Sequence, residues 1–246
     1  MNKNPAPQKT SAFTLIELLV VIAIIGILAG LLFPAIQGAL VNANALRVGN
    51  NGKNIVMAII SANTEREAMS MGSVWPTKTA TFKDGKTKND YSAGDAETYF
   101  VDLIESKAVD NLSWFVFAGA GVQAATDATQ FSDGGYNVWN YIGASDESAS
   151  DDTPFLFTRN FKLTTGDLKT YSEVDTIDNT NPFGELLDAS IKPFGDALTV
   201  FVTKGAAMTN LKKKFMINPK LFFGSATFGT DANMDATVVI AKGSGD

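Results

Sequence analysis

The chain has 246 residues and is 45% hydrophobic, enough for one fair-sized domain with an extra element or for two small domains. Its formal net charge of −6 has the wrong sign for a surface that binds nucleic-acid phosphates. We therefore expect no nucleic acid as a partner of the globular part of the chain. The chain contains no histidine and no cysteine, which excludes a serine–histidine–aspartate triad and a cysteine–histidine pair. These exclusions favour a protein that is not an enzyme.

The N-terminal part of the chain changes abruptly from polar to apolar. Residues 1–12 are polar and contain two lysines but no acidic residue. Residues 18–36 are almost wholly apolar, and the next charged residue is Arg47. A helix of about nineteen residues is ~28 Å long, which is close to the thickness of the hydrocarbon core of a bilayer. We therefore predict a single transmembrane segment at about residues 17–36, with a cytoplasmic N-terminus because the lysines precede it.

The helical pattern continues beyond this apolar segment. At spacings of three and four, one helix face would carry apolar or small side chains: Val41, Ala45, Val48, Gly52, Ile55 and Ile59. We predict one long helix over residues 13–68, whose first half lies in the membrane. Its second half would pack on a globular head formed by residues 69–246.

The head is predicted to be an α+β domain with an antiparallel sheet. Asp95 is well placed to cap a helix over residues 96–107. The inward-facing side chains of that helix would be Tyr99, Phe100, Leu103 and Ile104. Runs rich in β-branched and aromatic residues, bounded by Gly, Asp, Ser and Thr clusters, predict strands at residues 112–118, 136–143, 155–159, 198–203 and 237–241.

The sequence from Ser11 to Glu17 is S-A-F-T-L-I-E, and the apolar segment follows it directly. This stretch closely resembles the prepilin processing and methylation signature of type IV pilins and type II secretion pseudopilins. The resemblance implies that residues 1–12 are a leader peptide, that a prepilin peptidase/methyltransferase cuts between Ala12 and Phe13, and that it then N-methylates Phe13. The chain departs from the family pattern at Ala12, where the family usually has glycine.

Glu17 is the residue that we expect to act in subunit assembly. An ionisable group inside an apolar span costs roughly 2.5–3.5 kcal/mol at mid-membrane and less near an end, and a partner of opposite charge offsets that cost. The resemblance implies that the partner is the amine of Phe13 on a neighbouring subunit, since no partner is evident within the same chain. Such a pair would set the register between subunits. The alternative is a carboxylate that is simply solvated at the level of the lipid headgroups.

Two further positions in the apolar segment match the family. Gly26 and Pro34 stand where the family often has a glycine and a helix-loosening proline, so the helix between them could unwind on assembly. Gly26 and Gly30 also form a small-xxx-small pair, which permits close contact between membrane helices. Glycine is also generally common in such helices, and the pattern does not choose among these roles.

The resemblance implies a structural subunit of a type IV-like filament. The lack of cysteine favours a pseudopilin of a type II protein secretion system, and the alternative is a type IV pilus or DNA-uptake pilin. The implied partners are the prepilin peptidase/methyltransferase, other pilins or pseudopilins bound through the N-terminal helix, and an inner-membrane assembly platform. The implied location is the bacterial inner membrane, with a single span and the head on the periplasmic side, and then a periplasmic or cell-surface filament.

A third interpretation is a secreted or membrane-anchored binding protein with a soluble head. The sequence Ala43-Asn44-Ala45 fits the A-x-A pattern of signal peptidase sites. Against it, the apolar segment exceeds the ~7–15 residues of a usual signal peptide and has Glu17 at its start. Retention of the apolar segment in the mature protein distinguishes this interpretation from the first two.

Three groups of residues in the head could form binding sites, but we prefer a simpler structural explanation for each. We expect no cofactor. Calcium would need a shaped D-x-D-x-D-G-like loop, so an acidic loop in solvent is the expected state of Asp146, Glu147, Asp151 and Asp152. The basic run 212–214 is expected to be a solvated strand edge. Aromatic residues at strand spacing usually belong to the core, which we expect of Trp75, Trp114, Phe115, Phe117, Trp139 and Tyr141.

Overall fold

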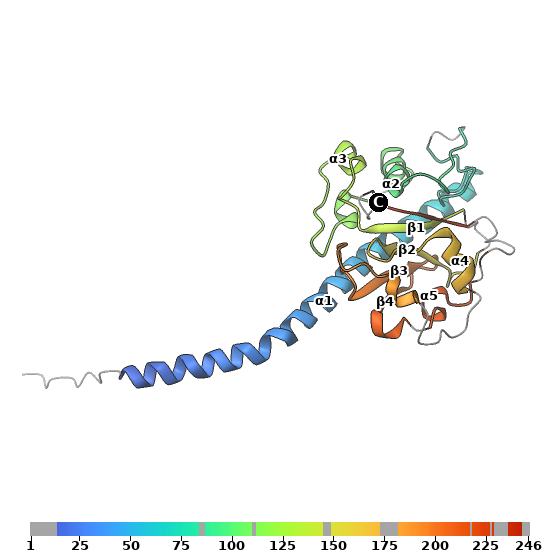
Figure 1. Cartoon of the computed structure of the whole chain (residues 1–246). Helices are drawn as coiled ribbons and strands as arrows, with labels where there is room; N and C mark the ends of the chain where they lie inside the picture. Colours follow the sequence, from blue (N-terminus) through green and yellow to red (C-terminus); the bar gives the residue numbers. More distant parts are fainter. Residues whose placement is uncertain are drawn as a thin grey trace, which may run out of the picture. The chain divides into compact units, whose positions relative to one another are not determined.

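The structure is a computed structural model that describes residues 14–83, 87–109, 112–144, 149–172, 182–216, 218–226, 228 and 236–242. Its contacts divide the chain into two units, Met1–Asn42 and Ala43–Asp246, and we call the second one the head unit. Helix α1 (Leu15–Ala68) begins in the first unit and ends in the second (Figure 1).

Helix α1 confirms the predicted long helix from Leu15 onward, and Phe13 lies outside the described residues. The helix has 54 residues and continues through Pro34. The predicted apolar stripe is buried in the head unit from Ala45 onward, whereas Val41 is half-buried. The buried residues of α1 are Ala45, Val48, Gly49, Gly52, Ile55, Val56, Ile59 and Ala62.

The head unit is built on a five-stranded antiparallel sheet with strand order β4-β3-β2-β1-β5. The strands are β1 (Trp139–Gly143), β2 (Pro154–Thr158), β3 (Leu198–Thr203), β4 (Met208–Lys212) and β5 (Thr237–Val239). The predicted α+β class with an antiparallel sheet is therefore confirmed. Strand β4 forms one edge of the sheet and β5 the other.

One face of the sheet packs against α1 at very short range. A Cβ atom added to Gly49 would lie 2.5 Å from Cγ of Met208, and one added to Gly52 would lie 2.6 Å from Cη2 of Trp139. Both distances are far below van der Waals contact. At Gly49 the flexible Met208 side chain could shift, whereas at Gly52 the buried Trp139 ring leaves room only for glycine. Glycine is unfavourable inside a helix by itself, and here it is retained for packing.

The opposite face of the sheet carries a second apolar core. Alternate residues of the strands, such as Phe157, Phe201 and Leu211, point to this side. They pack with the short helices α4 (Thr165–Ser172) and α5 (Lys220–Phe223) and with a 3₁₀ turn, η2 (Pro182–Leu186). The ring of Phe222 lies at the centre of this core, with its centroid 4.8 Å from that of Phe201.

Helix α2 (Ala96–Glu105) confirms the predicted helix and its cap. The carboxylate of Asp95 accepts a hydrogen bond from the backbone N–H of Thr98 at 3.0 Å. Tyr99, Phe100 and Leu103 are buried as predicted, whereas Ile104 is only half-buried. The helix ends two residues earlier than predicted, because the backbone of Lys107 adopts a left-handed conformation with φ = 52°.

The strand predicted at residues 112–118 is wrong. Trp114–Phe117 form a 3₁₀ helix, η1, in which the N–H of Val116 donates to the carbonyl of Ser113 at 3.1 Å. A 3₁₀ turn places residues i and i+3 on one side, so Trp114 and Phe117 both face Phe131, with centroids 4.8 and 5.1 Å away. Packing on Phe131 in helix α3 (Ala128–Ser132) thus overrides the alternating pattern that suggested a strand.

The other four strand predictions are correct within a few residues. A fifth strand of the sheet, β4, was not predicted. Strand β3 has the predicted bounds, and β2 is displaced by one residue from 155–159. Strand β1 starts at Trp139 and not at residue 136, because the side chain of Asn137 accepts the N–H of Trp139 at 2.9 Å and holds a turn. Strand β5 ends at Val239.

Strand β4 was not predicted. Its five residues, M-T-N-L-K, include only one fully buried side chain, Leu211, so they lack the alternation that marks a strand. The basic run follows directly: Lys212 ends this edge strand, and a further 3₁₀ turn, η3, covers Lys213–Phe215. The expectation of a strand edge therefore holds for Lys212.

Candidate functional site

The first turn of α1 is closed by a reciprocal pair of hydrogen bonds between Thr14 and Glu17. The backbone N–H and the hydroxyl of Thr14 each donate to Oε2 of Glu17 at 2.8 Å, and the N–H of Glu17 lies 3.3 Å from the Thr14 hydroxyl. This arrangement is a capping box, in which the side chains at the N-cap and at the third helical position satisfy backbone donors.

The capping box corrects the expectation that Glu17 has no partner within its own chain. Its signature, Thr followed three residues later by Glu, is visible in T-L-I-E, and the same four residues form part of the processing signature. The box orients the Glu17 carboxylate at the very start of the apolar helix. Ala12 and Phe13, the residues expected at the cleavage site, lie outside the described residues.

The apolar part of α1 is exposed along its whole described length in the first unit, apart from the half-buried Val41. It contains an 18-residue window of mean hydropathy 2.9 with none of its residues buried, and α1 is the one helix among the described residues that is long and apolar enough to cross a membrane. An apolar surface of this size is covered by lipid or by other protein when the molecule is in place.

Gly26, Gly30 and Pro34 all lie in regular, uninterrupted helix within this segment. A Cβ atom at Gly26 or Gly30 would meet no other atom within 4 Å. The small side chains therefore serve no packing within the described chain. They leave a smooth surface that another helix can approach closely.

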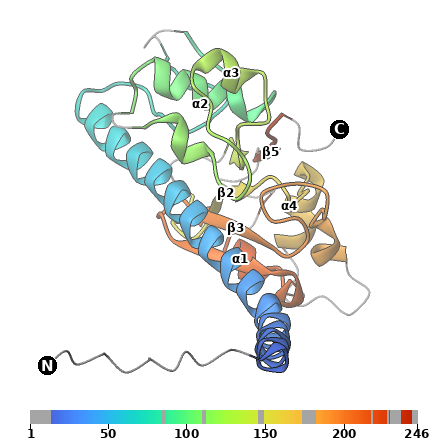
Figure 2. The same cartoon turned by 90° about the vertical axis from the view of Figure 1, so that its left-hand side faces the viewer.

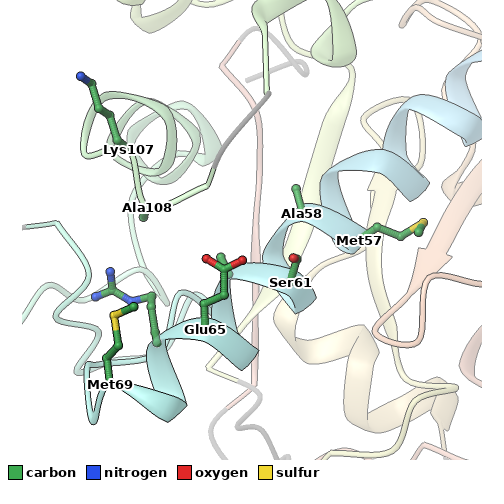
Figure 3. Close-up of a pocket in the computed structure, with 9 residues that line it drawn as sticks. Met57, Ala58, Ser61, Glu65, Met69, Lys107 and Ala108 are labelled. Atoms are coloured by element: carbon green, nitrogen blue, oxygen red, sulfur yellow. The ribbon is translucent and has the colours of Figure 1, made fainter.

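The head unit contains a polar groove of about 470 Å³ between the last turns of α1 and the end of α2 (Figure 3). Ala58, Ser61 and Glu65 line it from α1, whereas Lys107 comes from the end of α2 and its amine points away from the groove. Arg66 also lines it, but its Nε donates to the carbonyl of Gly72 at 2.6 Å, and burial lowers the pKa of its guanidinium. Ser61 and Glu65 are four residues apart on α1 and so lie on the same side of this helix.

The acidic residues considered for calcium do not form a metal site in the described structure. Asp146 and Glu147 lie outside the described residues. Asp152 accepts hydrogen bonds from Ser150 and Ser225, at 2.5 and 2.8 Å, and so joins two loops. Across the described ranges, three or more acidic, histidine or cysteine side chains do not gather anywhere into a group that could hold a metal ion.

A buried carboxylate holds the C-terminal part of the chain. Glu97 in α2 is fully buried, and its Oε2 accepts the backbone N–H of Lys242 at 3.0 Å. Burial raises the pKa of Glu97. The nearby Arg159 is also buried, with a guanidinium pKa lowered by desolvation and raised in part by the charge of Glu97. Both side chains lie inside the head and away from solvent.

The aromatic residues behave largely as core, with one exception. Trp75, Phe117, Trp139 and Tyr141 are buried, and Trp114 is half-buried. Phe115 is the exception, because the residue is 75% exposed. Its exposure was not predicted, and the alternation that suggested a strand gave no sign of it.

Comparison with known proteins identifies one feature. Residues 7–33 match the family model described as "Prokaryotic N-terminal methylation motif", which is typical of type IV pilins and pseudopilins. The match covers the predicted cleavage site, the capping box and the start of the apolar helix. The motif supports a type IV pilin-like filament subunit of structural type, processed by a prepilin peptidase and assembled with other pilins, and together with the apolar helix it fits anchoring in a membrane. No curated protein and no solved structure matched the chain.

Proposed function

We propose that this chain, which carries the methylation motif at residues 7–33, is a pseudopilin: a structural subunit of the short filament of a type II protein secretion system. The observation that carries the proposal is the placement of Glu17, a carboxylate held at the start of a fully exposed apolar helix and directly after the expected cut. A lone carboxylate in that position is costly in lipid and useful between subunits.

Processing is the first step of the proposed function. Residues 1–12 are a leader that the prepilin peptidase removes by cutting between Ala12 and Phe13, and the new amine of Phe13 is methylated. The small side chain of Ala12 fits a protease pocket that usually receives glycine. The transmembrane segment, at about residues 17–36, stays on the mature protein with the head on the periplasmic side.

Assembly is the second step. The Glu17 carboxylate of one subunit pairs with the Phe13 amine of the next, and this pair offsets the desolvation of both charges and sets the axial register. The Thr14 hydrogen bonds hold the carboxylate in place before the partner arrives, so less conformational entropy is lost on pairing. Gly26 and Pro34 bracket the stretch of helix that is able to loosen as subunits pack.

The secretion role is preferred over a surface or DNA-uptake pilus because the chain contains no cysteine, whereas many type IV pilins carry a pair in the head. Deleting the gene distinguishes these roles. Loss of exoprotein release with normal surface motility and DNA uptake supports the secretion role, whereas the reverse result supports the pilus role.

The secreted-protein alternative is disfavoured by the position of its cleavage site. Ala43 to Ala45 lie inside α1, and Ala45 is fully buried in the head unit. A peptidase that needs an extended, accessible substrate would have to unwind this part of the helix. A cut after Ala45 would also remove Ala45, the first buried residue of α1, from the head.

Mass spectrometry of the native N-terminus tests the proposal directly. We expect a mature chain that begins at Phe13 and carries one methyl group on its amine. A chain that begins at Leu46, or one that keeps Met1, would refute the filament proposal. The two cuts differ by more than thirty residues, so the peptide masses cannot be confused.

A further inference from the structure

The head unit presents an exposed aromatic side chain on one flank of α1 and an apolar groove on the other. Phe115 lies in η1 and is 75% exposed. On the other flank, a groove of about 450 Å³ lies between α1 and the turn that joins β3 to β4. The residues that line it are Lys53, Met57, Ile60, Ser61, Gly205, Ala206 and Ala207, and we call it the Met57 groove.

Phe115 is held firmly in its exposed position. The side chain of Asn51 on α1 donates to the carbonyls of Phe115 and Ala118, at 3.4 and 3.5 Å. Trp114 and Phe117, on either side of the exposed stretch, pack inward on Phe131. The backbone that carries the exposed ring is therefore fixed, and binding the ring would require ordering of its side chain alone.

The Met57 groove is apolar and open. Met57 and Ile60 are 52% and 38% exposed, and two alanines from the β3–β4 turn complete its wall. Lys53 is the single charged residue among those that line it. An aromatic ring suits such a groove because its edge packs on methionine and isoleucine while an ammonium group approaches its face.

The two features lie on opposite flanks of the helix. Asn51 and Lys53 are two positions apart in a helix, which places their side chains about 200° apart around its axis. Figure 2 shows the same relation: the green segment that contains η1 and the orange turn between β3 and β4 emerge on opposite sides of α1. Two copies with parallel α1 helices can therefore meet with Phe115 of one copy facing the Met57 groove of the other.

We infer that Phe115 of one subunit inserts into the Met57 groove of the next copy of the same chain. The inference rests on the proposed filament function and identifies one contact between the heads of neighbouring subunits in that filament. The contact is heterologous, because each subunit offers its ring on one side and its groove on the other, and such contacts propagate into rings or helical filaments. A buried aromatic anchor in a central pocket is also the usual source of binding energy in an interface.

The contact fixes the stagger between neighbours. Phe115 is tied to α1 at the level of Asn51, whereas the groove is centred near Met57. At 1.5 Å per residue, these levels are about 9 Å apart along α1. Each subunit should therefore be displaced by about 9 Å along the helix direction relative to the copy that it contacts.

The contact contains like charges at its edge. Arg47 lies beside Phe115, and Lys53 lies beside the groove, so the stagger brings two cations to the same level. Apolar burial must then carry the contact. Added salt should leave the contact intact or strengthen it, because salt screens the repulsion.

Cysteine pairs test the contact in the full-length chain, which has no cysteine of its own. We expect the double variant Arg47→Cys with Lys53→Cys, which keeps the Phe115 ring and is expressed in cells that assemble the filament, to form a ladder of disulfide-linked multimers on oxidation, because the stagger brings these two exposed positions to the same level. The matched control joins Lys53→Cys with Thr129→Cys, an exposed residue of α3, and should stay largely monomeric. Filaments that form normally in the Arg47→Cys/Lys53→Cys variant without a ladder would overturn the contact and leave the filament proposal intact.

Other outcomes are equally decisive. Dimers from Arg47→Cys alone would show a symmetric contact between two Phe115 flanks, and links to another protein would assign the groove to that partner. Either result overturns the inference. Absence of any filament from the unmodified chain would instead defeat the proposed function. As a second measurement, Phe115→Ala should lower filament yield at least about tenfold, whereas Phe215→Ala, which removes a ring 51% exposed elsewhere, should not.

Discussion

Gly52 of α1 lies directly against the indole of Trp139 in β1, where even one added methyl group would come within 2.6 Å of the ring. The ring is fully buried, and its Nε1 donates to the carbonyl of Val116 at 3.3 Å, so it cannot easily move aside. This contact sets the distance between the helix and the sheet.

We expect Gly52→Ala to destabilise the head by about 1–3 kcal/mol, because the new methyl group overpacks the Trp139 contact. The gain in helix propensity, about 1 kcal/mol, offsets only part of the cost. Gly166→Ala in α4 is the matched control, because a Cβ there meets only the Thr164 hydroxyl oxygen, at 3.8 Å. Urea unfolding should show the first variant weakened and the second unchanged or more stable. Equal stability of the two variants would show that α1 can shift away from the sheet.

Substitutions at Glu17 should separate its two roles. Glu17→Val and Glu17→Gln should both leave the leader cleaved and the protein in the membrane, yet both should reduce filament formation severely. Glutamine can still close the capping box with Thr14 but carries no charge for the Phe13 amine. Thr14→Ala removes the two hydrogen bonds of the Thr14 hydroxyl and keeps the Glu17 charge, so it should reduce assembly far less. Electron microscopy of sheared filaments measures the result, and normal filaments from Glu17→Gln would show that the charge is not needed.

The C-terminal half of α1 should be part of the fold of the head. A chain that begins at Ala39 should be soluble and monomeric, with mixed α and β circular dichroism. A chain that begins at Met69 lacks Ala45, Val48, Ile55 and Ile59, all fully buried. The aliphatic side chains among them contribute ~1.5–3 kcal/mol each, which together rivals the stability of a domain. Thermal melts of the two chains measure the difference, and equal melting temperatures would refute the packing role.

Glu97 should make the stability of the head depend on pH in a direction opposite to that of most carboxylates. Its folded-state pKa lies above the unfolded value of 4.5 because burial disfavours the charge. The ionised form therefore costs stability at neutral pH, and that cost disappears as the pH falls through the folded pKa toward the unfolded one.

Glu97→Gln, which keeps an acceptor for the N–H of Lys242, should raise the melting temperature at pH 7.5 relative to the unmodified head. The advantage should shrink as the pH is lowered toward 4.5. Glu105→Gln, on the exposed end of the same helix, is the control and should show no such trend. A difference that stays constant with pH would indicate that Glu97 acts through shape alone.

Features that depend on neighbours close in the chain could be predicted from the sequence. The long helix, the apolar segment, the Asp95 cap and strand β3 were predictable because each arises from local hydrogen bonds or from a regular spacing of apolar residues. The capping box at Thr14 and Glu17 was equally local, and its signature could have been recognised.

Features that depend on contacts between distant segments could not be predicted, because those contacts form only in the folded chain. Trp114–Phe117 form a 3₁₀ turn because Phe131 offers a packing surface, and β4 is a strand because β3 supplies its hydrogen bonds. The packing of α1 on the sheet likewise explains Gly52, which is unfavourable in a helix by itself and here lets the helix lie against the Trp139 indole. The exposure of Phe115 likewise follows from the inward packing of its neighbours, because an apolar residue carries no information about which side chains will cover it.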